Sequence, residues 1–208
     1  MADSIFNSTG VIVNPPDIPS FGNAGQVYNA DIFGGFNVSS EKNNILFNFR
    51  RGDSGVVNSD ALTNLTEDGK IGSTMSFVAT HVGVRVVKFG ANAALSFAEA
   101  QAAKSLIASA LIEIKYGSNE TKVGEFSGLH FSAPVDFVAE DASKTAAVQG
   151  GSGQAANWIR LSYPIQIQKN LNISGSVKFN TAVPASLTST PNSFGFIVML
   201  YGVKIVED

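Results

Sequence analysis

The chain of 208 residues contains no cysteine, and this absence removes several functional classes at once. Without thiols there are no disulfides, no thiolate metal sites and no cysteine nucleophiles. The cellular compartment stays open, because a cysteine-free chain suits reducing and oxidising surroundings alike. No apolar run approaches the roughly 20 residues that a membrane-spanning helix needs, and the first residues lack the basic and apolar segments of a signal peptide. We therefore expect neither a membrane-spanning helix nor a secretion signal.

Charge is also scarce. Only 15% of the residues are charged, the formal net charge is −3, and the mean hydropathy is positive. The first 28 residues contain no Lys or Arg, so the chain has no basic arm that could neutralise packaged nucleic acid. We expect no strong nucleic-acid binding. Because low charge density promotes association, either the exterior is neutral-polar or much of it is buried in an assembly.

Catalytic and metal-binding sequence motifs are missing as well. His81 and His130 are the only histidines, and they lack the His-x-His spacing that a cupin-type metal site would show. No Gly-x-Ser-x-Gly elbow is present, and the glycine-rich run at 150–153 matches neither phosphate-binding motif. The acidic pairs Glu67-Asp68 and Glu140-Asp141 fall in polar turns, and adjacent residues in a strand would point to opposite faces, so neither pair is expected to flank one glycosidic bond. We predict no enzyme, no cofactor, no metal site and no small-molecule substrate.

Short apolar bursts, separated by polar residues, Gly and Pro, dominate what is present. Alternation of this kind is typical of an antiparallel β-sandwich, in which one face of each strand is buried. We predict an all-β domain over residues 41–208, with about eight strands in two sheets. The clearest strand candidates cover residues 45–49, 75–89, 111–116, 121–126, 158–163, 165–167, 173–179 and 194–201.

One segment departs from this pattern. Residues 91–109 are rich in Ala, Leu, Glu, Gln and Lys, which are good helix formers. The spacing of Ser96 and Glu99 is that of a capping box, with a hydroxyl at the cap and a carboxylate three positions later. We predict one helix inserted at about 95–109, packed onto the sandwich through Phe97, Leu106 and Ile107.

Two segments carry little regular pattern. Residues 1–40 are rich in Gly, Pro, Asn and Ser, and the prolines between residues 15 and 19 disfavour helix. We predict an extended N-terminal arm over 1–40 with at most one short strand. A polar, Ala/Gly/Ser-rich stretch at about 139–156 predicts a long mobile loop, because loops of this length in compact domains are usually functional or mobile.

Two groups of surface candidates remain. Arg51-Gly52-Asp53 is the integrin-recognition tripeptide, although Arg-Gly-Asp-Ser-Gly also makes an ordinary turn; we treat it as a candidate surface-contact loop. Isolated aromatic residues in a sandwich most often belong to the core, but a sugar could stack on them. The candidate ligand-stacking aromatics are Tyr28, Trp158 and Tyr163.

The order of segments in the second half of the chain resembles the jelly-roll capsid proteins of tailless icosahedral bacteriophages. A capped helix is followed by the hairpin-like 111–122, a glycine-rich loop, and the strands at 158–167, 172–179 and 196–205. In that family a late strand of the form polar-Pro-Ile-x-Ile precedes a core strand, and the chain ends on an apolar strand with Leu-x-Gly-Val. The resemblance covers about residues 90–206.

This resemblance implies a virion structural protein, a capsid subunit that is assembled in the host cytoplasm from copies of itself and other virion proteins. It brings no catalytic residues. A double jelly roll needs about sixteen strands at roughly 8–12 residues each with their turns, which leaves little chain for arm, helix and loop, so a single jelly roll fits better. Without a basic arm, genome contacts would be sparse or made by another component, such as an internal membrane layer.

Two other functional classes stay open. The first is a phage spike, receptor-binding or carbohydrate-binding β-sandwich that would use the aromatic residues or the Arg51-Gly52-Asp53 turn. The second is an enzyme on a cupin-like barrel, which would require a bound metal. Oligomeric state separates a shell subunit from a monomeric binder, and elemental analysis tests the enzyme.

Overall fold

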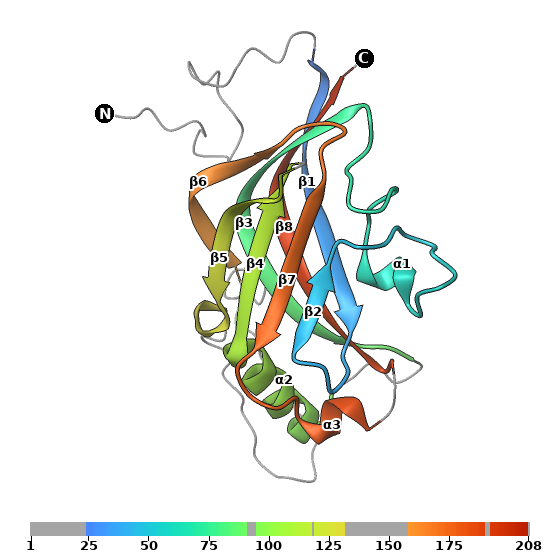
Figure 1. Cartoon of the computed structure of the whole chain (residues 1–208), viewed down its shortest axis with the longest axis vertical. Coiled ribbons are helices and arrows are strands. Elements are labelled where there is room, and N and C mark those ends of the chain that lie inside the picture. Colours follow the sequence, from blue (N-terminus) through green and yellow to red (C-terminus); the bar gives the residue numbers. More distant parts are fainter. Residues whose placement is uncertain (1–23, 91–94, 118, 132–157, 190–191, 208) are drawn as a thin grey trace.

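The computed structural model describes residues 24–90, 95–117, 119–131, 158–189 and 192–207. It confirms the predicted all-β sandwich: eight strands form two four-stranded antiparallel sheets that face each other (Figure 1). The first sheet has the order β1-β8-β3-β6, and its strands are β1 (Ala24–Asn37), β8 (Phe194–Glu207), β3 (Met75–Lys88) and β6 (Trp158–Ile167). The second has the order β2-β7-β4-β5, with β2 (Asn43–Leu46), β7 (Ile173–Phe179), β4 (Ala110–Tyr116) and β5 (Thr121–Ser127).

The strand order is that of a single jelly roll. The first strand pairs with the eighth, the second with the seventh, the third with the sixth and the fourth with the fifth, all antiparallel. The eight strands therefore form one long folded-over hairpin. Rolling this hairpin into two layers adds the pairs β3–β8 and β4–β7 and produces the two-sheet jelly-roll arrangement.

The core lies between the two sheets, where alternate side chains of each strand meet. Three phenylalanines join the layers: the ring of Phe196 (β8) stacks on Phe36 (β1) with centroids 5.4 Å apart. It also meets Phe179 (β7) edge-on, again at 5.4 Å. Phe196 is fully buried. Because β7 belongs to the opposite sheet, this aromatic cluster ties the two layers together.

The predicted helix is confirmed as α2 (Phe97–Ser109). The Ser96 hydroxyl accepts a hydrogen bond from the Glu99 backbone N–H at 3.3 Å, and the Glu99 carboxylate accepts one from the Ser96 N–H at 2.7 Å. This is the reciprocal capping box that the spacing predicts. Leu106 is fully buried in the core and Ile107 packs against it. Phe97, expected to dock with them, is half-buried.

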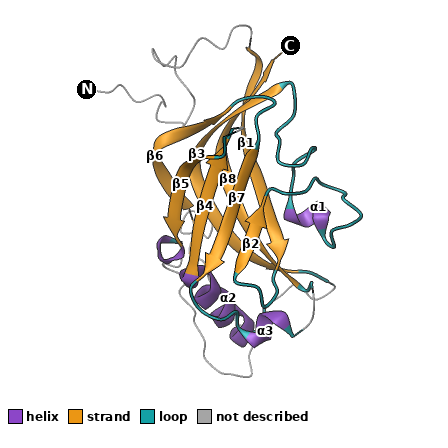
Figure 2. Ribbon diagram, in the orientation of Figure 1, coloured by secondary structure: helices purple, strands orange, loops and turns teal. Residues whose placement is uncertain are grey.

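Two shorter α-helices and one turn of 3₁₀-helix accompany α2. The four-residue α1 (Ser59–Leu62) lies in the connection between β2 and β3, and α3 (Ala185–Thr188) lies beside α2 at one end of the sandwich (Figure 2). The 3₁₀ turn spans Gly128–His130. In the part of the chain that the structure describes, no helix is both long and apolar enough to cross a membrane.

The prediction of an extended arm over residues 1–40 is wrong for its second part. Residues 24–37 form the long strand β1, paired with β8 along its length. The glycines that suggested an arm allow close approach instead: a Cβ on Gly34 would lie 2.4 Å from the ring of Phe47, and one on Gly35 would lie 2.5 Å from the Phe196 carbonyl oxygen. The first 23 residues, and the loop predicted at 139–156, lie outside the described residues.

Candidate functional site

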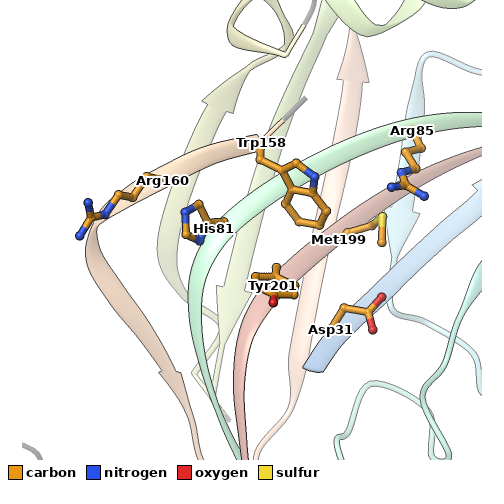
Figure 3. Close-up of a pocket in the computed structure, with 7 residues that line it drawn as sticks. All are labelled: Asp31, His81, Arg85, Trp158, Arg160, Met199 and Tyr201. Carbon is orange, nitrogen blue, oxygen red and sulfur yellow. The ribbon is translucent and has the colours of Figure 1, made fainter. Parts of the chain in front are cut away.

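A pocket of about 660 Å³ opens on the outer face of the β1-β8-β3-β6 sheet (Figure 3). The alternation of the strands places it there: Val82, Val84, Val198 and Leu200 belong to the core, so the residues between them on β3 and β8 face outward. All four strands of the sheet contribute side chains. The lining consists of Asp31, His81, Arg85, Trp158, Arg160, Met199 and Tyr201.

Strand register brings these residues together from distant parts of the sequence. One cross-strand row runs through all four strands, because Asp31 is paired with Tyr201, Tyr201 with His81, and His81 with Arg160. In the next row Gly83 is paired with both Trp158 and Met199. Residues paired in this way present their side chains side by side on one face.

A glycine makes room for the only tryptophan of the chain. A Cβ on Gly83 would lie 2.8 Å from Cε3 of Trp158, so the indole lies directly over the β3 backbone. The ring then meets Tyr201 edge-on with centroids 5.7 Å apart, and Tyr201 meets the His81 ring edge-on at 6.2 Å. The three rings form a continuous aromatic floor.

A β-bulge determines which way His81 points. β3 carries one extra residue, Thr80, between the pairs Ala79–Gly202 and His81–Tyr201. Ala79 faces the core, and the inserted residue shifts the alternation so that His81 faces outward. Without the bulge, the histidine would point between the two sheets.

The same bulge fixes the histidine ring. The Thr80 hydroxyl donates its single hydrogen to the Tyr201 carbonyl oxygen at 3.2 Å. It can then only accept a hydrogen bond from Nδ1 of His81, which lies 2.9 Å away. In the neutral ring this arrangement leaves Nε2 as a hydrogen-bond acceptor.

The surroundings of His81 in the pocket favour its uncharged form. Burial lowers the pKa of His81 below its ordinary value of 6.5, and the nearby positive charge of Arg160 lowers it further. Among the residues that the structure describes, neither the Asp31 carboxylate nor the Arg85 guanidinium takes part in an ion pair. The pocket therefore contains free hydrogen-bonding groups beside an aromatic floor.

The described residues offer no group of three or more His, Asp or Glu side chains placed to hold a metal ion. The two histidines of the sequence are not brought together, since His81 lies in β3 and His130 ends the short 3₁₀ turn. The pocket can bind a ligand through ring faces, one carboxylate, guanidinium groups and an imidazole.

Of the three candidate stacking aromatics, the structure places one in the pocket. Trp158 lies at its centre, whereas Tyr163 is 87% exposed and does not line it. Tyr163 belongs to an outward bulge of β6, where residues 161–164 stand opposite the single residue Thr80 of β3. Tyr28 lies in β1, and its side chain is outside the described residues.

Sequence reasoning missed most of the pocket. A usable signal exists on β3, where His81, Gly83 and Arg85 alternate with core valines. On β8, Met199 and Tyr201 likewise occupy outward positions. These patterns identify an outer face, but they do not say that β3 lies between β6 and β8.

The candidate contact loop Arg51-Gly52-Asp53 lies elsewhere and forms a structured turn. Arg51 pairs with Asp60 at 3.7 Å, and the Asp53 carboxylate accepts a hydrogen bond from the Gly55 N–H at 2.9 Å. Gly52 has a φ of +76°, which favours glycine. Its use as a contact surface stays a prediction.

The fold and the pocket define this protein as a jelly-roll β-sandwich with a mixed aromatic and polar site on one outer face. No family model, no curated protein and no solved structure matches the chain. The similarity to phage capsid proteins therefore stays a prediction from sequence pattern. Function has to be argued from the surface of the molecule.

Proposed function

We propose that the protein is a virion structural protein, a jelly-roll capsid subunit that assembles with copies of itself into an icosahedral shell. The observation that carries this proposal is a large exposed apolar or aromatic side chain on each of two sheet edges, which lie on opposite sides of the sandwich. Ile45 on edge strand β2 is 60% exposed, and Tyr163 on the bulge of edge strand β6 is 87% exposed.

Edge strands present unpaired backbone N–H and C=O groups, and proteins that stay monomeric commonly protect such edges with charged side chains. β5 is protected in this way, because Lys122 forms ion pairs with Glu113 and Glu125. β2 itself contains no charged residue, and neither does the β6 bulge at 161–164. These two edges are therefore suited to contact between subunits.

The positions of the two edges support a repeating assembly. β2 and β6 lie in different sheets and on opposite sides of the sandwich (Figure 1). A contact between the β2 edge of one subunit and the β6 edge of the next would be head-to-tail, and such heterologous contacts generate rings when the rotation closes and open filaments when it does not; a shell subunit requires closure. Low charge and positive mean hydropathy favour the same association.

Size-exclusion chromatography with light scattering, together with negative-stain microscopy, tests this proposal. We expect closed particles or discrete rings. Burying Ile45 at a contact contributes about 1–2 kcal/mol for its exposed part, so Ile45→Asp should raise the concentration needed for assembly at least about tenfold. Val57→Asp is the matched control, since Val57 is 55% exposed but lies in a loop.

We further propose that this subunit works in the virion beside other virion proteins and makes few genome contacts itself. The net charge of −3 supports this, and contact with an internal membrane layer is compatible with it. Binding of single-stranded DNA that weakens steeply as salt increases would contradict this part of the proposal, because such dependence reports many phosphate contacts.

A second candidate, a spike or carbohydrate-binding module, is favoured by the aromatic pocket of Figure 3. A monomer or small oligomer that is retarded on a glycan column would favour this candidate over a shell subunit. The two roles are compatible in one molecule, because the pocket lies on the sheet face and the proposed contacts lie on the edges.

A further inference from the structure

The aromatic floor of the pocket is bordered by polar groups of opposite charge. In Figure 3, the guanidinium of Arg85 and the carboxylate of Asp31 lie on the Met199 side of the indole, whereas the guanidinium of Arg160 points away from it. Asp31 and Arg85 carry opposite charges on the Met199 side, and Arg160 adds a second positive charge on the His81 side of the pocket. His81 adds an uncharged hydrogen-bond acceptor at Nε2.

This combination limits the kind of ligand that fits. Aromatic ring faces carry negative partial charge and attract weakly positive C–H groups. A carboxylate accepts hydrogen bonds from hydroxyls, and a guanidinium donates them. A ligand that matches both the aromatic ring face and the polar groups around it has one flat C–H face and a rim of hydroxyl groups. A volume of about 660 Å³ lies within the usual range for small-ligand sites.

Other ligand classes match less well. Nucleic-acid bases also stack on aromatic rings, but such sites rely on a positively charged groove that follows the phosphates. Here a carboxylate, that of Asp31, lies beside the two guanidinium groups of the lining, and the whole chain has a net charge of −3. An acidic sugar would gain from Arg85 but would face the carboxylate of Asp31.

We propose that this pocket binds a neutral hexopyranose unit, whose C–H face stacks on Trp158, with Tyr201 edge-on beside that ring, while its hydroxyls bond to Asp31, Arg85 and His81. The site belongs to the single subunit and does not depend on shell assembly. The proposal assigns to the outer sheet face a role in recognising sugar-coated surfaces.

Trp158 makes the site directly observable, because it is the only tryptophan in the sequence. Its fluorescence is measured on the full chain during titration with glucose, galactose, mannose and N-acetylglucosamine, and separately with glucuronate. We expect a saturable change with at least one neutral sugar at millimolar concentration and a response at least tenfold weaker with glucuronate. Equal or stronger binding of glucuronate would overturn the assignment of a neutral ligand.

Variants separate binding at this pocket from binding elsewhere. Asp31→Asn removes the carboxylate and should weaken sugar binding at least tenfold. Gly83→Ala places a methyl group where the indole lies and should abolish the response without changing a polar group. Arg50→Gln, an exposed arginine outside the pocket, is the control and should bind as the unmodified chain does.

If Gly83→Ala prevents folding, Asp31→Asn alone carries the test, with the circular dichroism spectrum as a check of the fold. The proposal is overturned if none of the neutral sugars gives a saturable change, or if Asp31→Asn binds like the unmodified chain. Its failure leaves the shell proposal standing, because assembly is measured by particle size and not by sugar binding.

Discussion

Removing the Phe196 ring tests how the two sheets are held together. Phe196 is fully buried and contacts Phe36 in its own sheet and Phe179 in the opposite one, each at 5.4 Å between centroids. Deleting a buried phenylalanine side chain costs about 3–5 kcal/mol, from lost transfer free energy and the cavity left behind. Each aromatic pair contributes about 0.5–1.5 kcal/mol beyond buried area, so Phe196→Ala should lie at the upper end of that range.

Against a total stability of about 5–15 kcal/mol for a domain, such a loss is easily measured. The assay is urea unfolding followed by Trp158 fluorescence at low protein concentration, because assembly would otherwise add to the apparent stability. Phe196→Leu should lose less, since most of the side-chain volume remains. Tyr163→Ala is the surface control and should change the free energy of unfolding by less than about 0.5 kcal/mol. A loss below about 1 kcal/mol for Phe196→Ala would refute the packing described here.

Three further predictions concern the helix, the sheet and the histidine. Ser96→Ala removes the cap of α2 and should lower the free energy of unfolding by about 0.5–2 kcal/mol, measured by the same urea series. Gly202→Ala should fail to fold, because its Cβ would lie 1.9 Å from the Val78 carbonyl oxygen; a soluble, folded Gly202→Ala protein by circular dichroism would show that β3 and β8 are not paired in this register. The lowered pKa of His81 means that its contribution to stability is present above pH 6.5 and is lost as the pH falls through the lowered value. His81→Gln should therefore lose less stability than the unmodified chain between neutral and acidic pH, and identical pH profiles would contradict this.

Local patterns in the sequence predicted the parts of the fold that depend on local interactions. The capping box of α2 needs only the spacing of Ser96 and Glu99, and the alternation of the strands needs only neighbouring residues. β1 was not predicted in full, because its glycines have a non-local cause. Gly34 makes room for Phe47, and Gly35 makes room for the backbone of β8, more than 150 residues away along the chain.

The pocket likewise combines features that local sequence can indicate with features that depend on distant contacts. Trp158 could be chosen as a candidate from its residue type alone, but its neighbour Tyr201 reaches it only because β8 lies beside β3 and β3 beside β6. His81 faces the pocket because Thr80 forms a bulge, and nothing in the local sequence marks that residue as inserted. Register and bulges are tertiary features, so a site built across four strands could not be assembled from sequence pattern.

The particle mass of the purified protein, measured by light scattering across a range of concentrations and compared with Ile45→Asp, decides the proposed role as a shell subunit. We expect particles or rings much heavier than one 21.8 kDa chain, formed at concentrations where Ile45→Asp stays monomeric. An unmodified chain that remains a monomer at every concentration would contradict it.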